Sequence, residues 1–272
     1  PSAKEDAPAL IRLNVWADQP KAMTTRATDE NAIADMHVLV YNASGNLIGQ
    51  TYTTGTTASI STRSAKGCRI YAITNTGEAS LFAGQKADTE EKLKNLTVSI
   101  SSWDNITNRA NMLMVGSKQF DIEPGEQTLT GGISVSRMAA KVTLDIKGKE
   151  GLGITITDYQ WVDLPDQAYY ILRPLTTEGA MEDTQEPPLS NLDAPATTWL
   201  NSPQIAVNAA TVKTTFYMFE NRKGNKAALT EQKDKTEANA PARSSYVLIR
   251  GKGPGFTASW RVYLGANNAS NF

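Results

Sequence analysis

The chain of 272 residues has few of the side chains on which most enzymes and metalloproteins depend: it has one cysteine, Cys68, and one histidine, His37. A single cysteine excludes an intrachain disulfide. The usual nitrogen and sulfur ligands of a zinc site are also lacking. Both residues lie in alternating apolar runs. We therefore predict that Cys68 packs in or near the core as a small hydrophobe and that His37 is a hydrogen-bonded strand residue.

Charge of one sign and long apolar runs are lacking as well. The formal net charge is −1, which gives no electrostatic reason to expect nucleic acid or an anionic membrane as a partner. No run of 18 or more apolar residues occurs, so the sequence predicts no membrane-spanning segment. Residues 1–8 have neither the charged nor the apolar region of a signal peptide, and we expect that any export signal has been removed.

Catalytic and phosphate-binding motifs are the third absence. The chain has no GxSxG elbow, no P-loop and no GxGxxG, and its glycine-rich stretches at 148–153 and 251–255 are typical of hairpin turns. The sequence therefore predicts no enzyme, no catalytic residue, no cofactor and no metal site.

Short alternating apolar runs bounded by Gly, Asn, Asp and Pro recur along the whole chain, which is typical of an all-β protein. The length suits two sandwich domains of ordinary size. A single helix is predicted, with Asp88 as its N-cap and with Leu93 and Leu96 on one face. We place the domain boundary at the Gly131–Gly132 pair, which gives an N-terminal domain of residues 1–131 and a C-terminal domain of residues 132–272.

The N-terminal segment is the most informative part of the sequence. Within residues 10–17, Ile11, Leu13 and Val15 alternate with polar residues, and a polar, Thr-rich stretch containing Arg26 follows. A strand tethered by such a loop can be detached by a single cut. A sandwich that loses a strand exposes a hydrophobic groove that can accept a strand from another molecule.

A second cluster contains aromatic and acidic residues: Trp161, Asp163, Asp166, Tyr169 and Tyr170. In one interpretation a strand ends here in a proline turn, and the aromatics fill the core or cover a sheet edge. In another, the cluster is an exposed ligand patch that binds a glycan. In a third, the two acids face each other across a cleft, as in a glycosidase.

Seven segments of the chain occur in the order in which similar segments occur in the fimbrillin family of Bacteroidales, the major fimbrial subunits of type V pili. The chain resembles this family in residues Thr24–Gly49, Tyr71–Phe82, Asn111–Ser117, Ile133–Ile146, Thr215–Asn225, Ser244–Gly253 and Arg261–Phe272. Each segment is weak alone, and the shared order carries the resemblance.

The resemblance implies two tandem transthyretin-like (Greek-key) β-sandwich domains, with one short helix in the N-terminal domain. It implies a lipoprotein at the surface of a Gram-negative bacterium, which contacts the outer membrane only through a lipid anchor on its precursor. It also implies that an arginine-specific protease cuts between Arg26 and Ala27. The first strand then leaves, and a strand from another copy or from a related pilin subunit fills its groove.

One alternative to this filament-forming subunit and one question about its donor strand stay open. The chain could instead be a surface adhesin or tip protein that does not polymerise and that binds a host surface glycan or protein. Members of the family also continue beyond a segment like Arg261–Phe272 with a further strand. Whether the C-terminal segment of this chain is the donor strand is therefore left open by the sequence.

Overall fold

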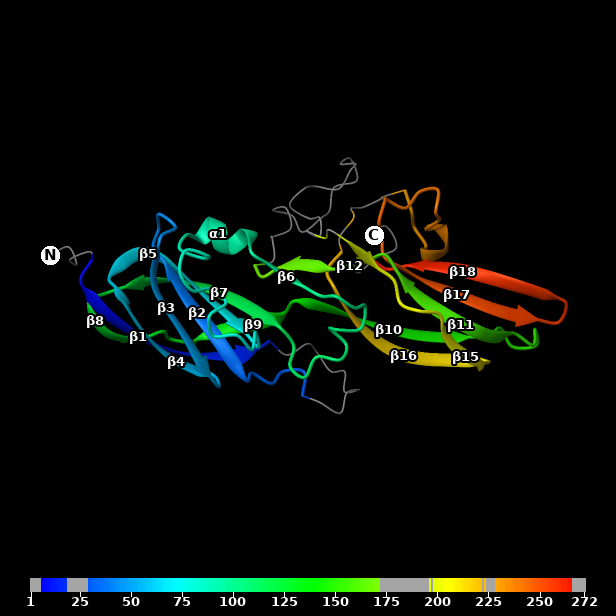
Figure 1. Cartoon of the computed structure of the whole chain (residues 1–272), viewed down its shortest axis with the longest axis horizontal. Helices are drawn as coiled ribbons and strands as arrows, with labels where there is room; N and C mark the ends of the chain where they lie inside the picture. Colours follow the sequence, from blue (N-terminus) through cyan, green and yellow to red (C-terminus); the bar gives the residue numbers. More distant parts are fainter. Residues whose placement is uncertain are drawn as a thin grey trace. The chain divides into compact units, whose positions relative to one another are not determined.

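The computed structural model describes residues 6–18, 29–171, 196, 198–221, 223 and 228–265. These residues form a nearly all-β structure, as predicted, and they divide into two compact units (Figure 1). The first unit contains residues 6–96, 109–138 and 170–171, and the second contains residues 97–108, 139–169 and the described residues from 196 onward. Within this part of the chain, no helix is long and apolar enough to cross a membrane.

The first unit contains eight strands and one helix: β1 (Pro8–Ala17), β2 (Asp35–Tyr41), β3 (Leu47–Thr54), β4 (Thr57–Arg63), β5 (Ala65–Thr74), α1 (Glu90–Asn95), β7 (Met114–Ile122), β8 (Gly125–Thr128) and β9 (Ile133–Arg137). Their hydrogen-bonded order is β3-β2-β5-β7-β9-β1-β4, and β8 also pairs with β1. Because β9 pairs with both β7 and β1, it joins the layer of β2, β5 and β7 to the layer of β1 and β4.

One apolar core lies between these two layers. It contains Ile11 of β1, Ile60 of β4, Val38 of β2 and Ile70 of β5, each of them fully buried. Cys68 is buried in the same core, which confirms its predicted role as a small hydrophobe.

The other face of β2 is also covered, so that every residue of this strand is buried. His37 lies on this face, where its ring packs edge-on against Phe82 and its Nε2 hydrogen-bonds to the Glu78 carbonyl oxygen at 2.9 Å. Burial lowers the pKa of His37, and the bond to that carbonyl opposes the change only in part. The prediction of a hydrogen-bonded strand histidine is therefore confirmed.

Helix α1 packs near this face, and its N-cap is Thr89 instead of the predicted Asp88. The Thr89 hydroxyl accepts a hydrogen bond from the Lys92 amide. The Asp88 carboxylate instead pairs with the Lys92 side chain at 2.7 Å, one turn along. Either residue type can cap a helix, and the position of the first helical turn decided between them.

Glu90 joins α1 to strand β5. Its carboxylate accepts a hydrogen bond from the Tyr71 hydroxyl at 2.6 Å and pairs with Lys94 at 2.9 Å and with Arg69. Burial by itself would raise the pKa of Glu90, but these three donors outweigh it and hold the pKa at about 2.

The second unit contains the remaining elements: β6 (Thr97–Ser99), β10 (Ala139–Lys147), β11 (Thr155–Val162), β12 (Leu164–Pro165), β13 (Gln167–Tyr169), β14 (Trp199–Leu200), β15 (Ile205–Ala209), β16 (Thr211–Phe219), the 3₁₀ helix η1 (Gln232–Asp234), β17 (Tyr246–Gly253) and β18 (Phe256–Tyr263). Its largest sheet has the order β15-β11-β17-β18, and β10 pairs with β16. Trp161 stacks on Phe216 in the core, with 4.7 Å between ring centroids.

The division between the units lies after Met138, whereas the sequence placed a boundary at Gly131–Gly132. Strand β9 begins directly after this glycine pair and hydrogen-bonds to β7 and β1. It therefore belongs to the first unit. A glycine pair is a good turn signal, but a turn inside a domain gives the same signal as a turn between domains.

Candidate functional site: the seat of strand β1

Strand β1 buries every second side chain in the core of the first unit. Ala9, Ile11, Leu13 and Val15 are between 0 and 8% exposed, whereas the residues between them face outward or are half-buried. This alternation is what the sequence pattern predicted for Ile11, Leu13 and Val15. It places β1 as an integral strand of the sandwich, because its side chains complete the core.

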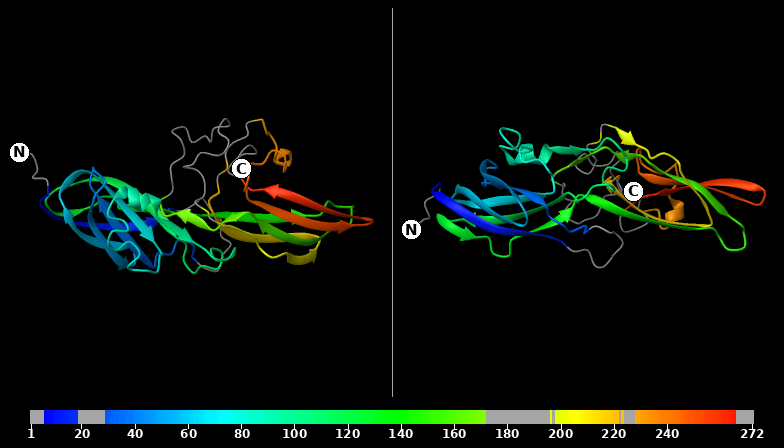
Figure 2. Two further views of the ribbon diagram at one scale, coloured as in Figure 1. Left: turned by 45° about the horizontal axis from the view of Figure 1, so that its top comes forward. Right: turned by 60° about the horizontal axis from the view of Figure 1, so that its bottom comes forward.

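Both edges of β1 are hydrogen-bonded. It runs antiparallel to β4, from Pro8 opposite Arg63 to Asn14 opposite Thr57. On its other edge it runs parallel, first to β8 and then to β9, where Val15 lies opposite Ile133 (Figure 2). Loss of β1 would therefore leave unpaired backbone groups on two sides of an open apolar groove.

Gly132, in the turn before β9, lies very close to β1. Its φ is +54°, and a Cβ on this residue would lie 2.3 Å from the backbone oxygen of Asn14 and 2.7 Å from the ring of Trp16. The approach of β1 to this turn therefore requires a residue without a side chain. Gly131 also has a positive φ of +74°, but a Cβ there would meet only the flexible end of Lys118 at 3.4 Å.

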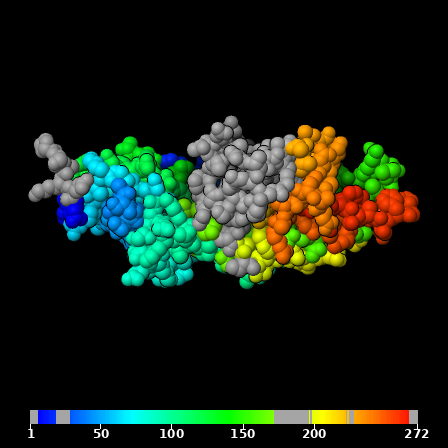
Figure 3. Space-filling model, turned by 90° about the horizontal axis from the view of Figure 1, so that it is seen from above, coloured from blue at the N-terminus to red at the C-terminus, as the bar shows by residue number. Residues whose placement is uncertain are grey.

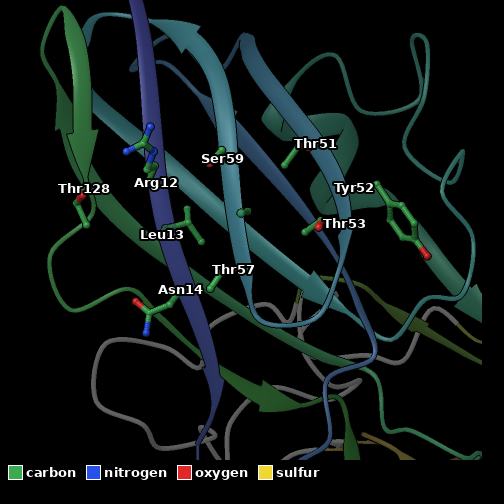
Figure 4. Close-up of a pocket in the computed structure, with 10 residues that line it drawn as sticks. Arg12, Leu13, Asn14, Thr51, Tyr52, Thr53, Thr57, Ser59 and Thr128 are labelled. Carbon is green, nitrogen blue, oxygen red and sulfur yellow. The ribbon is translucent and has the colours of Figure 1, made fainter.

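The outer face of β1 is mixed, with the polar Arg12 and Asn14 beside Trp16, which is 43% exposed. Arg12 pairs with Glu126 of β8 at 3.0 Å, and both side chains are more than half exposed. A groove of about 580 Å³ opens where β1, β4 and β3 meet, lined by residues that include Leu13 and Asn14 (Figure 4). On the face of the molecule shown in Figure 3, little of the blue strand β1 reaches the surface.

The chain leaves β1 and returns to β2 at neighbouring points on β9. The Asp18 amide donates to the Val135 carbonyl oxygen at 2.7 Å. Two residues further along β9, Arg137 donates to the Asn31 side chain at 2.6 Å and to the Glu30 carbonyl oxygen at 3.3 Å. Arg26 and Ala27, the predicted processing site, lie outside the described residues, between these two anchored ends.

Asn75 fixes the returning segment from the opposite side. Its side chain donates to the carbonyl oxygens of Ala32 and Met112 and accepts from the Ala34 amide, at 2.6–2.8 Å. With a φ of +63°, Asn75 adopts the left-handed conformation that asparagine tolerates better than most residues. The sequence signals for this anchor are only the Asn-Thr-Gly turn at 75–77, and nothing in the sequence singles out Arg137.

The second predicted cluster is not an exposed aromatic patch. Trp161 is 1% exposed in the core of the second unit, and Tyr170 is 6% exposed in the first unit, where it packs on Phe82. The interpretation in which aromatics fill the core is therefore the correct one for these two rings. The sequence could not distinguish a buried aromatic cluster from an exposed aromatic patch, because both contain the same residue types.

The acidic members of this cluster have structural contacts. Asp163 pairs with Arg243 at 2.9 Å. Asp166 is 9% exposed, and its backbone bonds to Ile100 and Thr198. Tyr169 lies in β13, opposite Thr97 of β6. Among the described residues, no group of three or more His, Cys, Asp or Glu is arranged to hold a metal ion.

Two known families match separate parts of the chain. The family described as "Major fimbrial subunit protein (FimA)" matches residues 9–132, which contain almost all of β1 and its partners β4 and β8 and end directly before β9. A second family, described as "Domain of unknown function (DUF4906)", matches residues 216–272. No curated protein matches the chain in sequence.

Solved structures share the fold over almost the whole chain. A fimbrilin from Porphyromonas gingivalis W83 aligns with a TM-score of 0.57 at 14% identity, covering 96% of this chain and 85% of its own. The tip fimbrial protein Mfa3 of Porphyromonas gingivalis aligns with a TM-score of 0.55 at 9% identity, covering 96% and 83%. A fimbrial assembly protein from Parabacteroides distasonis ATCC 8503 aligns with a TM-score of 0.50 at 12% identity, covering 96% and 87%.

These matches confirm the resemblance to the fimbrillins that the sequence indicated. The chain carries the sequence pattern of a fimbrial subunit in the region of β1 and has the fold of Bacteroidales fimbrial proteins. The family model and the three solved structures are all described as fimbrial proteins.

Proposed function

We propose that this fimbrillin-like chain is a subunit of a surface fimbria and that it is activated when β1 is removed by a cut after Arg26. A strand from another copy, or from a related pilin subunit, then occupies the seat of β1. Repeated head-to-tail contacts of this heterologous kind extend an open filament instead of closing a ring.

One observation carries this proposal: the covalent connection between β1 and the other described strands of the unit runs through the segment between Asp18 and Asp29. The two ends of that segment are held on β9, through Val135 and Arg137. A cut within the segment therefore separates β1 from every other strand without breaking any of the ladders among β2, β5 and β7. Every other described strand of the unit is connected through the chain at both of its ends.

The strength of the joint follows from the burial of β1. Full burial of three side chains of the size of Ile11, Leu13 and Val15 contributes about 5–9 kcal/mol in transfer free energy before ordering entropy is subtracted. A donor strand with the same alternation would be held as firmly as β1.

The chemistry of this function lies in the partners. An arginine-specific protease supplies the cut, and the subunit itself needs neither a catalytic residue nor a cofactor. The export route that we propose is that of a surface lipoprotein, with a lipid anchor on the precursor that holds it at the outer membrane.

A second candidate is a tip or adhesin role, in which the chain binds a host surface glycan or protein. The observation in its favour is the shared fold with the tip fimbrial protein Mfa3. A tip subunit would still accept or donate a strand, but it would end a filament instead of extending it.

The test is limited digestion of the folded chain with an arginine-specific protease, followed by N-terminal sequencing, mass spectrometry of the released peptide, size-exclusion chromatography and negative-stain microscopy. We expect a new N-terminus at Ala27, release of the β1 peptide, and ladders or filaments. Arg26→Gln should block the cut, and Arg26→Lys should move it to a lysine-specific protease with the same assembly product.

Each outcome has a distinct meaning. A segment that resists cutting at Arg26 while other arginines are cut would contradict the proposed activation. A chain that is cut correctly, loses β1 and stays monomeric at high concentration would contradict the filament-forming role. It would then favour the tip role, which binding of that monomer to a glycan array would test.

A further inference from the structure

Strands β3 and β4 have the sequence of a β-hairpin but are not paired as one. They are joined by a loop of two residues, Gly55 and Thr56, and Gly55 has a φ of +82°. Loops of two residues with glycine at a positive φ are the commonest connection between paired antiparallel strands. Yet, among the described residues, β3 forms a ladder only with β2 and β4 forms one only with β1.

The two strands meet at both ends of this seam. Beside the loop, Thr54 and Thr57 are held together by the chain itself. At the other end, a Cβ on Gly49 would lie 2.9 Å from the Ser61 carbonyl oxygen and 2.9 Å from Thr62 Cβ. Counting equally outward from the loop leads from Thr54 to Gly49 and from Thr57 to Thr62, so both ends have the same register.

Between these ends the seam is open. The groove of about 580 Å³ is lined there by Thr51 and Thr53 of β3 and by Thr57 and Ser59 of β4. In Figure 4, Thr51 and Thr53 point from β3 toward β4. Leu13 of β1 also lines the groove, so β1 borders the space that separates the two strands.

We propose that β1 holds this hairpin open and that β4 closes onto β3 when β1 leaves. In the part of the chain that the structure describes, β4 forms a ladder with β1 alone, so loss of β1 removes every described ladder hydrogen bond of β4. Among the described residues the facing edge of β3 forms no ladder, and it lies in register with β4. The loop holds one end of the seam, and at the other end the Thr62 hydroxyl donates to the Ile48 carbonyl oxygen at 3.0 Å. Closure places Tyr52 opposite Ser59 and pairs the facing edges of β3 and β4 with each other.

This hairpin switch rests on the proposed function in one respect: the proposed cut after Arg26 is what allows β1 to leave. The subunit without β1 then has two states: β4 either lies beside the groove or pairs with β3. A donor strand then has to draw β4 back before it can form a complete ladder. The emptied groove thus lacks β4 as one of its side strands until a well-matched strand arrives.

The test locks the hairpin in the full-length, uncut chain. The double variant Tyr52→Cys/Ser59→Cys joins residues that face each other in the closed register, and Tyr52→Cys/Ser61→Cys is the control that lies two residues out of register. Cys68 is fully buried and is retained in both. Hydrogen–deuterium exchange of the amides of residues 8–17 is followed before oxidation, after oxidation and after reduction.

We expect oxidation of the 52/59 pair to raise exchange in β1 and reduction to restore its protection. The 52/61 pair should form its disulfide more slowly and leave β1 protected. A 52/59 disulfide that forms while β1 stays fully protected would overturn the proposal. So would a 52/59 pair that stays reduced under oxidising conditions even when Ile11→Ala loosens β1.

Neither a protease nor a filament enters this measurement. A chain that never polymerises but loses β1 protection on locking refutes the proposed function and supports the hairpin switch. A chain that polymerises normally with the 52/59 disulfide in place, and whose β1 is protected before cutting, supports the proposed function and refutes the hairpin switch.

Discussion

Strands β1 and β18, the first and the last described strands, differ in the way their units hold them. Strand β1 has a hydrogen-bonded partner on each edge and buries Ile11 completely. Among the described strands, β18 pairs only with β17, and two of its aromatic side chains, Phe256 and Trp260, are 43% and 40% exposed. A terminal strand can thus be central to a core or peripheral to it. Only the central kind leaves a deep groove when it departs.

The largest expected effect comes from truncating an inward side chain of β1. Ile11→Ala should destabilise the first unit by about 2–5 kcal/mol, because a fully buried isoleucine leaves a cavity. Phe256→Ala in β18 is the matched control and should cost only about 0.5 kcal/mol, because the ring is partly exposed already. Urea unfolding, with hydrogen exchange to assign each transition to its unit, measures both. Equal losses would remove the contrast between the two strands.

The next prediction concerns the turn beneath β1. Gly132→Ala should destabilise the unit by about 1–3 kcal/mol more than Gly131→Ala, because only its methyl group overlaps the backbone of Asn14. Both substitutions share the strain of a positive φ, so the difference isolates the contact with β1. Protection of β1 amides should fall only in Gly132→Ala. If the two variants behave alike, the close approach does not contribute to the seat.

The effect of pH sharpens the comparison within the first unit, because it acts on α1 and leaves β1 untouched. Glu90 has a pKa of about 2 in the folded chain, well below its ordinary value of 4.5. Its contribution to stability is therefore fully present above about pH 5 and is lost as the pH falls toward 2. The difference in urea midpoint between wild type and Glu90→Gln should shrink over this range.

Glu91→Gln is the control for this pH series, because Glu91 lies next to Glu90 on the exposed side of α1. It removes a charge without removing the contacts to Tyr71, Arg69 and Lys94. A pH profile of Glu90→Gln parallel to that of wild type would show that another group carries the acid sensitivity.

The smallest expected effect belongs to the exposed ion pair on the outside of β1. Arg12→Gln should lower stability by about 0.2–1 kcal/mol at low salt, and by less at high salt, because both partners are well hydrated. Glu126→Gln should give the same loss, and the double variant should cost little more than either. A loss comparable to that of Ile11→Ala would mean that the polar face, and not the core, holds the strand.

Much of this fold could be predicted from local patterns. The alternation of residues 10–17 predicted a half-buried strand, and β1 extends over Pro8–Ala17 with the expected side chains inward. Cys68 and His37 took the places that their flanking residues indicated. The helix was predicted in the right place but with its cap one residue early, at Asp88 instead of Thr89.

Pairings over long distances could not be predicted in this way. The parallel contact of β1 with β8 and β9 joins residues more than a hundred positions apart, and no local pattern encodes it. The segment containing β3 and β4 shows the opposite case, in which a strong local hairpin signal is overridden by two separate partners. The burial of Trp161 also depended on Phe216, which lies far along the chain.

The sequence by itself determined the all-β class, the inward face of β1 and the absence of the motifs that enzymes need, because period-two alternation and residue chemistry are local properties. The tertiary structure decided which strands lie beside β1, that position 132 requires glycine, and that β4 is separated from β3. These depend on how distant segments compete for the same backbone hydrogen bonds and the same apolar core, and that competition is settled only when the whole unit folds.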